Sequence, residues 1–182
     1  MTIILNSKTD TFGIFLWRLT ALHLITYFMV GIIAMNLFSY EHLFSSGNLA
    51  LLMKPLDSPW VALGPGLQIF RGLVFAIVLW PFKSVFLNTE YGWLKLWLLF
   101  IGLSILSTFG PAIGSIDGMI YTTIPIGRQI LFLPELFSQS FLLSFGIYYW
   151  YRKPKRVFKI ISIILVSLIL LMSVAGFLSL NT

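Results

Sequence analysis

The length of the uncharged apolar stretches constrains this chain most strongly. After Lys159 the sequence reaches Thr182 without another charged side chain. An α-helix rises about 1.5 Å per residue, so roughly 20 apolar residues cross the hydrocarbon core of a bilayer. We expect membrane-spanning helices in the five stretches that meet this length, 12–38, 67–87, 92–109, 129–151 and 157–180.

The composition excludes most soluble folds. Charged residues make up 10% of the chain and apolar residues 58%, whereas a soluble domain carries about 25% charged residues. The absence of cysteine excludes disulfides and thiolate metal sites. Apolar runs such as 160–166 do not alternate with polar residues, as the strands of a membrane β-barrel must. We therefore predict an all-α integral membrane protein, a single transmembrane domain over 1–182 built as a bundle of five transmembrane helices.

Basic residues are concentrated on one predicted face of the membrane. With these five spans, nine of the twelve Lys and Arg residues fall on that face, and Lys54, Arg71 and Arg128 fall on the other. Cytoplasmic segments of multi-pass proteins carry the excess of Lys and Arg, so the N-terminus is predicted to be cytoplasmic and the C-terminus outside. We expect a multi-pass protein of the inner or plasma membrane.

The densest basic segment, 152–156, lies between the last two predicted spans. Its first expected role is to set the topology. It also belongs to a net charge of +6 that should attract anionic lipid headgroups, by about 1 kcal/mol per basic residue near the surface. The expected partners are therefore membrane lipids, with a partner membrane subunit or a homo-oligomer as further options, and no nucleic acid. The predicted headgroup contacts are Arg152, Lys153, Lys155 and Arg156.

Two predicted outer loops, 54–71 and 109–128, are rich in glycine and proline. The first contains three prolines and two glycines, which should prevent a continuous helix. It also contains Leu56, Trp60 and Leu63, which favour a buried position over water. Non-helical backbone at membrane depth must be buried in protein or line a cavity, so we expect both outer loops to be partly buried.

Polar residues in these segments indicate a binding site at the outer mouth of the bundle. In the pocket hypothesis, Arg71 anchors an anion, and Asp57 or Asp117 is its partner or a proton acceptor. In the competing hypothesis, Arg71 is a structural lock that ties a loop to a helix through the same carboxylates. The predicted cluster comprises Asp57, Gln68, Arg71, Asp117 and Tyr121.

Three polar residues within the predicted spans are secondary candidates. His23 lies near mid-depth, where we favour a hydrogen bond to a neighbouring helix over a proton relay. A bis-histidine haem would need a facing ligand, and His42 follows the outer end of the same helix. Glu135 directly follows Pro134, as expected at a helix start, where an acid suits the positive end of the dipole. Gln139 is four residues further along the same face.

Part of the first outer loop resembles a known family. The motifs Lys54-Pro55, Pro59-Trp60-Val61 and Gly64-Pro65 are similar to the first loop of the translocator protein (tryptophan-rich sensory protein) family. The resemblance covers about a dozen positions and implies binding of porphyrins or other flat hydrophobic ligands. The chain departs from the family in its third span, where 98–106 lacks the tryptophan pattern.

No catalytic motif is present. The phosphate-binding Gly-Lys-Ser/Thr run, His-Glu-x-x-His and Gly-x-Ser-x-Gly are all absent. We therefore expect no metal and no cofactor, and favour a non-enzymatic subunit, receptor or carrier with a polar pocket at its outer mouth. One alternative is a membrane-embedded enzyme acting on a lipid or polyprenyl phosphate, with Arg71 on the phosphate and Asp57 or Asp117 as base. The other is a translocator-like binder of flat ligands.

Overall fold

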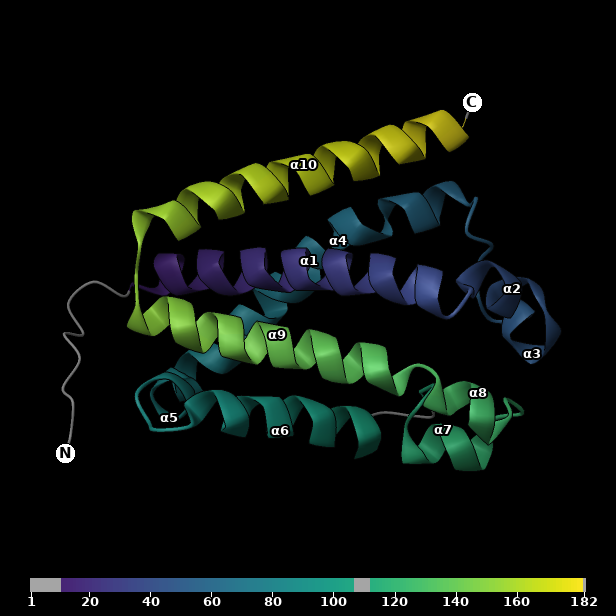
Figure 1. The fold of residues 1–182 in the computed structure, drawn as a ribbon, viewed down its shortest axis with the longest axis horizontal. Helices are drawn as coiled ribbons and strands as arrows, with labels where there is room; N and C mark the ends of the chain where they lie inside the picture. The colour runs from purple at the N-terminus through teal and green to yellow at the C-terminus, as the bar shows by residue number, and fades with distance from the viewer. Residues whose placement is uncertain (1–10, 107–111, 182) are drawn as a thin grey trace.

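A computed structural model of the chain describes residues 11–106 and 112–181, and every regular element in these ranges is helical. This confirms the predicted all-α class. The longer helices lie roughly side by side (Figure 1) and are α1 (Phe12–Leu37), α4 (Pro59–Leu79), α6 (Gly92–Leu106), α9 (Leu133–Arg152) and α10 (Arg156–Leu180). The short elements are α2 (Tyr40–Ser45), α3 (Gly47–Ala50), the 3-10 helix η2 (Trp80–Phe82), α5 (Lys83–Leu87), α7 (Ile116–Tyr121) and α8 (Ile126–Ile130).

Four helical segments of the described chain are long and apolar enough to cross a membrane, namely Phe12–Leu37, Pro59–Leu87, Ile126–Arg152 and Arg156–Leu180. The predicted span 92–109 corresponds to α6, which is apolar but has 15 residues. At about 1.5 Å per residue, α6 is shorter than a hydrocarbon core of about 30 Å. Residues 107–109 of that prediction lie outside the described ranges. The fifth span therefore stays a prediction.

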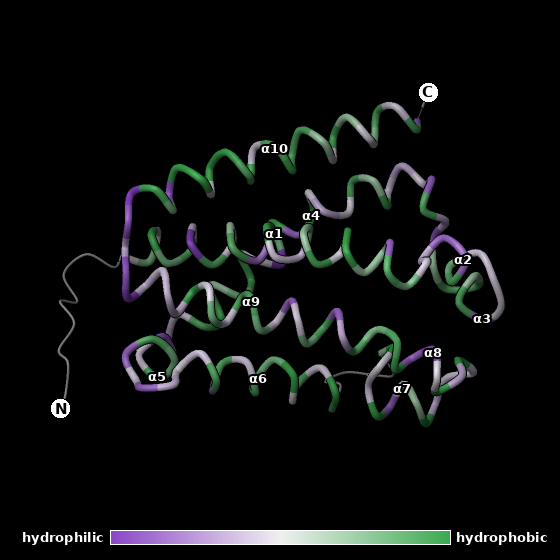
Figure 2. The backbone as a smooth tube through the Cα atoms, in the orientation of Figure 1, coloured by the Kyte–Doolittle hydropathy of each residue, from purple (hydrophilic) through white to green (hydrophobic). Residues whose placement is uncertain are grey.

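The two ends of the bundle differ in chemistry. One end holds the start of α1, α5 and the connection from α9 to α10 (Figure 1), with Lys83, Lys95 and the basic segment 152–156. We call it the basic end. The opposite end, called the loop end, holds α2, α3, α7, α8 and the end of α10. Figure 2 shows hydrophilic residues gathered at the α9–α10 connection, whereas the long helices are mainly hydrophobic.

Helix α1 is the centre of the bundle. Helices α9 and α10 lie on either side of it, and α4 crosses behind it (Figure 1). In the most apolar stretch of α1, 44% of the residues are buried, against 17–22% in the other three membrane-length segments. The other helices therefore pack around α1 and leave their outer faces to the surrounding medium.

Helix α4 begins at Pro59, eight residues before the predicted start of the second span at Leu67, so the prediction of non-helical backbone over 59–66 is wrong. Pro59 lies in the first turn, where a helix tolerates its missing N–H and where its fixed φ is suitable. Pro65, inside α4, removes one backbone hydrogen bond. Membrane helices tolerate such a proline because neighbouring helices support the backbone. Here α10 packs directly on α4, since a Cβ added to Gly66 would lie 3.1 Å from Ser173 Cβ.

The remaining parts of the two predicted outer loops consist of turns and short helices. Residues 51–58 form turns before α4. In the second segment, α7 and α8 pack around the buried side chain of Gln129. Its Oε1 accepts from the Gly114 N–H at 3.2 Å, and its Nε2 donates to the carbonyl oxygens of Gly118 at 3.1 Å and Ile124 at 2.9 Å. A buried amide thus satisfies backbone groups of Gly114 and Ile124, which lie outside the helices, and of Gly118 in α7.

Helices α1 and α4 approach each other backbone to backbone at Gly72. A Cβ added to Gly72 would lie 2.9 Å from Thr20 Cα, closer than side chains come to backbone. Ala76, four residues further along α4, is also fully buried. Two small residues at this spacing are typical of close contacts between membrane helices.

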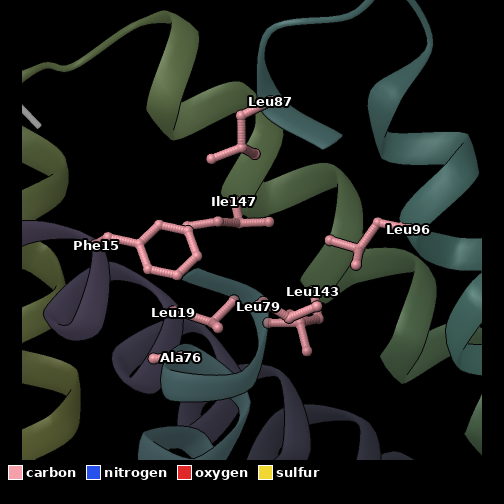
Figure 3. Packing of buried hydrophobic residues seen from close by; sticks show 8 residues of the cluster. All are labelled: Phe15, Leu19, Ala76, Leu79, Leu87, Leu96, Leu143 and Ile147. Atoms are coloured by element: carbon pink, nitrogen blue, oxygen red, sulfur yellow. The ribbon is translucent and has the colours of Figure 1, made fainter. Parts of the chain in front are cut away.

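The apolar core lies toward the basic end of the bundle. Figure 3 shows side chains from α1, α4, α5, α6 and α9 converging there. This cluster comprises Phe15, Leu19, Ala76, Leu79, Leu87, Leu96, Leu143 and Ile147. A second cluster joins α1 to α10 and comprises Ala21, Leu24, Val166 and Ile169. The two clusters use different sides of α1, which explains its central position.

Polar side chains lie inside the bundle, and its exposed faces are apolar. On α10, Ser162 is 3% exposed, whereas Ile164 is 60% exposed and Leu171 is 69% exposed. A helix at the surface of a soluble protein shows the reverse pattern. Inside the bundle, the indole N–H of Trp17 donates to Ser162 Oγ at 3.2 Å. This arrangement suits a hydrocarbon surrounding, in which polar groups find partners on neighbouring helices.

Replacing Gly72 with alanine tests the contact between α1 and α4. The added methyl group must push the two helices apart, so we expect G72A to lower the free energy of unfolding by about 2 kcal/mol, as overpacking does. Gly102→Ala is the control, because a Cβ there would meet no atom within 4 Å. Circular dichroism in mild detergent follows the unfolding. Equal stability of the two variants would contradict the close contact.

Candidate functional site

At the loop end, α4 separates from α1 and packs against α10. Helices α1 and α4 are in contact at His23 and Gln68, whose side chains lie within hydrogen-bond distance of each other. Further along, α4 lies against α10, where the rings of Trp60 and Phe177 meet edge to face with centroids 5.7 Å apart. The separation opens a groove between α1 and α4.

This outer groove has a volume of about 790 Å³, which lies in the range of small-molecule pockets. Helix α2 and the turns of residues 51–58 contribute to it at the loop end, and the start of α9 adds a further wall. Most of its lining is apolar or aromatic. The aromatic lining residues are Tyr27, Phe28, Tyr40, Phe44, Trp60 and Phe132.

Glu135 is the only carboxylate among the described residues that line the outer groove. Its Oε2 accepts a hydrogen bond from the hydroxyl of Tyr40. Its Oε1 faces α1, because a Cβ added to Gly31 would lie 4.0 Å from this oxygen. Burial, and after it the hydrogen bond to Glu135, raise the pKa of the Tyr40 hydroxyl, so that it remains a donor. Lys54 is the one basic residue that the described lining contains, and its Nζ lies 5.4 Å from the ring centre of Trp60.

Local sequence explains how Tyr40 and Glu135 are positioned. Pro134 and Glu135 lie in the first turn of α9, which confirms the predicted helix start. Tyr40 begins α2 directly after Ser39, whose φ of +50° turns the chain sharply. Helix α2 thereby lies against the start of α9, with the ring of Tyr40 5.5 Å from that of Phe132.

His23 and Gln68 join α1 to α4 deep in the bundle. His23 is 1% exposed, and its Nε2 lies 3.3 Å from Oε1 of Gln68. The predicted hydrogen bond from His23 to a neighbouring helix is therefore confirmed. The ring of Phe75 packs edge-on against the imidazole, with centroids 5.0 Å apart. Gln68 thus belongs to the interface between two helices.

The residues of the predicted outer-mouth cluster are not held together around Arg71 by direct contacts. Arg71 is exposed on α4, and its Cζ lies 5.5 Å from the ring centre of Phe75. Asp57 lies in the turns before α4, and Asp117 and Tyr121 lie on α7. In the described part of the chain, no hydrogen bond or ion pair joins Arg71 to either carboxylate. No direct contact therefore supports either the pocket hypothesis or the lock hypothesis for Arg71.

Sequence reasoning did not find the outer groove as a whole. Gln139 is half-buried four residues beyond Glu135 but does not line the groove. No sequence pattern singles out Tyr27 or Tyr40, since nothing local shows which helix they face. The sequence feature that pointed to the outer groove was Trp60, an apolar residue in a predicted loop. Trp60 does line the groove.

No group of three metal-ligating side chains comes together within residues 11–106 and 112–181. Comparisons of the chain with protein families, with curated proteins and with solved structures gave no match. The segment that resembles the translocator family contributes to the outer groove, through Lys54, Trp60, Val61, Gly64 and Pro65.

Removing the Tyr40 hydroxyl tests its pairing with Glu135. Tyr40→Phe keeps the ring but leaves the carboxylate without its donor, so we expect the free energy of unfolding to fall by about 1–2 kcal/mol. Tyr121→Phe is the matched control, because Tyr121 is 74% exposed. In a double-mutant cycle, Y40F and E135Q should be non-additive. Additive losses, measured by thermal unfolding in detergent, would show that the two side chains do not interact.

Proposed function

We propose that this chain is a multi-pass membrane protein with five spans, its N-terminus in the cytoplasm and its C-terminus outside. The exposed apolar faces of the membrane-length helices support membrane insertion. The start of α1 and the end of α10 lie at opposite ends of the bundle (Figure 1), in agreement with an odd number of spans. The positive-inside rule then assigns the basic end to the cytoplasm.

The packing of α6 supports a fifth span. Helix α6 runs alongside α9 (Figure 1), and the indole N–H of Trp97 donates to the carbonyl oxygen of Phe137 at 3.2 Å. Leu98 and Leu103 are exposed on its outer side. Its 15 residues reach about 22 Å, so a crossing also needs adjacent residues or a locally thinner bilayer.

The absence of cysteine allows a direct test of the orientation. Glu90→Cys and Asn181→Cys each introduce one thiol at an exposed position, at the basic end and at the loop end respectively. On intact cells, we expect a membrane-impermeant maleimide to label N181C and not E90C. After permeabilisation both should react. Labelling of E90C alone in intact cells would show the orientation opposite to the one proposed. Labelling of both variants would contradict an odd number of spans.

We propose further that the protein is a non-enzymatic receptor or carrier that binds a hydrophobic ligand in the outer groove. One observation carries this proposal: the Glu135 carboxylate has only Tyr40 as a hydrogen-bond partner in the described chain, and it faces an aromatic groove. A carboxylate in apolar surroundings is costly unless it is paired. A ligand that supplies a cation or a hydrogen-bond donor therefore gains affinity at Glu135, while its apolar part gains from the walls.

The outer groove favours a flat neutral or cationic ligand over an anionic one. Phe28, Phe44 and Trp60 offer aromatic surfaces on which a planar molecule can stack. This agrees with the flat hydrophobic ligands that the translocator resemblance implies. A ligand carboxylate close to Glu135 would be repelled, because two like charges at short range oppose each other in a medium of low dielectric constant.

The enzyme alternative has less support. It requires Arg71 to hold a phosphate close to Asp57 or Asp117 as base, and no contact in the described chain brings Arg71 to either acid. The outer groove, in contrast, combines the Glu135 carboxylate with a hydroxyl donor and apolar walls. That combination favours binding over hydrolysis or transfer.

Three pyrene derivatives test the ligand preference, because they share one flat ring and differ in one polar group. The full chain in mild detergent is titrated with pyrenemethylamine, pyrenemethanol and pyrenecarboxylate, and binding is followed by fluorescence. We expect the amine to bind most tightly and the carboxylate most weakly. Glu135→Gln should weaken amine binding about tenfold, the loss expected for one charge-assisted hydrogen bond, and change alcohol binding much less.

Asp117→Asn is the matched control, since it removes another acid at the loop end that does not line the groove. D117N should bind all three probes like the unmodified protein. Equal affinity for the three probes, or an equal loss in E135Q and D117N, would contradict a binding role for Glu135.

A further inference from the structure

A second groove opens between α9 and α10 near the basic end. The two helices are joined by residues 153–155 and diverge on either side of α1 (Figure 1). Leu22 and Ile25 of α1 form its floor. Gly146 of α9 packs closely on this floor, since a Cβ there would lie 3.2 Å from Leu22 Cδ2. This inner groove has a volume of about 270 Å³.

The inner groove is apolar inside and aromatic near the α9–α10 connection. Ile161 and Leu165 of α10 line its aliphatic part. Closer to the connection, the ring of Phe158 lies 6.0 Å from that of Tyr149 and 6.2 Å from that of Trp150. Tyr and Trp concentrate at the level of lipid headgroups, where one part of the ring is apolar and one edge is polar. The aromatic end therefore has the chemistry of a membrane interface.

Cationic groups surround this aromatic end. The Nζ of Lys153 lies 5.2 Å from the ring centre of Tyr149, and the Cζ of Arg18 lies 5.8 Å from that of Trp150. Further basic side chains, Lys155 and Arg156, are exposed where α10 begins. An apolar groove with positive charge at one end complements a molecule with an apolar chain and an anionic head.

Arg152 is bound within the protein. Its Nη2 donates to the carbonyl oxygen of Thr89 at 3.0 Å, and its Cζ lies 4.5 Å from the ring centre of Tyr148. It thereby ties α9 to the turn that precedes α6. This separates Arg152 from the other basic residues of 152–156, whose charged groups remain exposed.

We propose that the inner groove binds one anionic phospholipid, with an acyl chain between α9 and α10 and its phosphate at Lys153, Lys155 and Arg156. The apolar interior favours a hydrocarbon chain, and the cations supply the complement to a net negative headgroup. The site is independent of the ligand proposed for Glu135. The lipid-site proposal rests on the proposed membrane insertion but not on the proposed orientation. Lipid binding measured in detergent does not depend on the orientation, so this test is separate from the labelling test.

Charge-matched variants test the headgroup contacts. The full chain in mild detergent is titrated with dioleoyl phosphatidylglycerol or dioleoyl phosphatidylcholine, and bound lipids are counted by native mass spectrometry. We expect one phosphatidylglycerol to bind preferentially. Lys153→Gln/Lys155→Gln should weaken it about 25-fold, because each basic residue near the surface contributes about fivefold. Lys83→Gln/Lys95→Gln removes the same charge at the same end and should change affinity less than about threefold.

The acyl chain is tested at two neighbouring positions of α10. Ile161 lines the inner groove, whereas Ile160 is exposed outside it. Ile161→Trp should therefore fill the groove and lower phosphatidylglycerol binding about tenfold or more, the effect of losing about two buried methylene groups, while Ile160→Trp should not. Glycerol 3-phosphate, which has no acyl chain, should not displace the lipid. Equal losses in the two lysine pairs, or displacement by glycerol 3-phosphate, would overturn the proposal.

Discussion

The close backbone contact at Gly72 sets how α4 crosses α1, the central helix of the bundle. Because no side chain separates Gly72 from Thr20, the two helices can cross closely at this level. Toward the basic end, α4 then joins α1 in the core shown in Figure 3. Toward the loop end, α4 packs against α10 through Gly66. The crossing of α4 over α1 therefore contributes to both the core and the outer groove.

Both grooves arise because neighbouring helices diverge, but they place polar groups differently. In the outer groove, Glu135 and Tyr40 lie among aromatic walls. The lining of the inner groove is mainly apolar, and Lys153 and Lys155 are exposed in the adjoining α9–α10 connection. The first arrangement suits a ligand whose polar group enters the bundle. The second suits a lipid whose headgroup stays at the membrane surface.

Predictions succeeded where one local physical rule was sufficient. A polar side chain in the middle of an apolar helix needs a partner, and His23 has one on α4. A proline followed by an acid marks a helix start, and α9 begins there. The prediction for 59–66 was wrong because proline and glycine disfavour a helix in isolation, whereas α10 packs on α4 at Gly66. Packing against a neighbouring helix stabilises a helix here that local proline and glycine rules exclude.

The sequence by itself determined the all-helical class, the presence of long apolar helices and the uneven distribution of basic residues. These properties depend on the length and polarity of contiguous segments, which can be read along the chain. Only the tertiary structure decided that Tyr40 meets Glu135, 95 residues away, and that the Arg71 cluster is not joined by direct contacts. Such pairings depend on where helices cross and where they diverge, and that geometry is set by packing between segments that are distant in sequence.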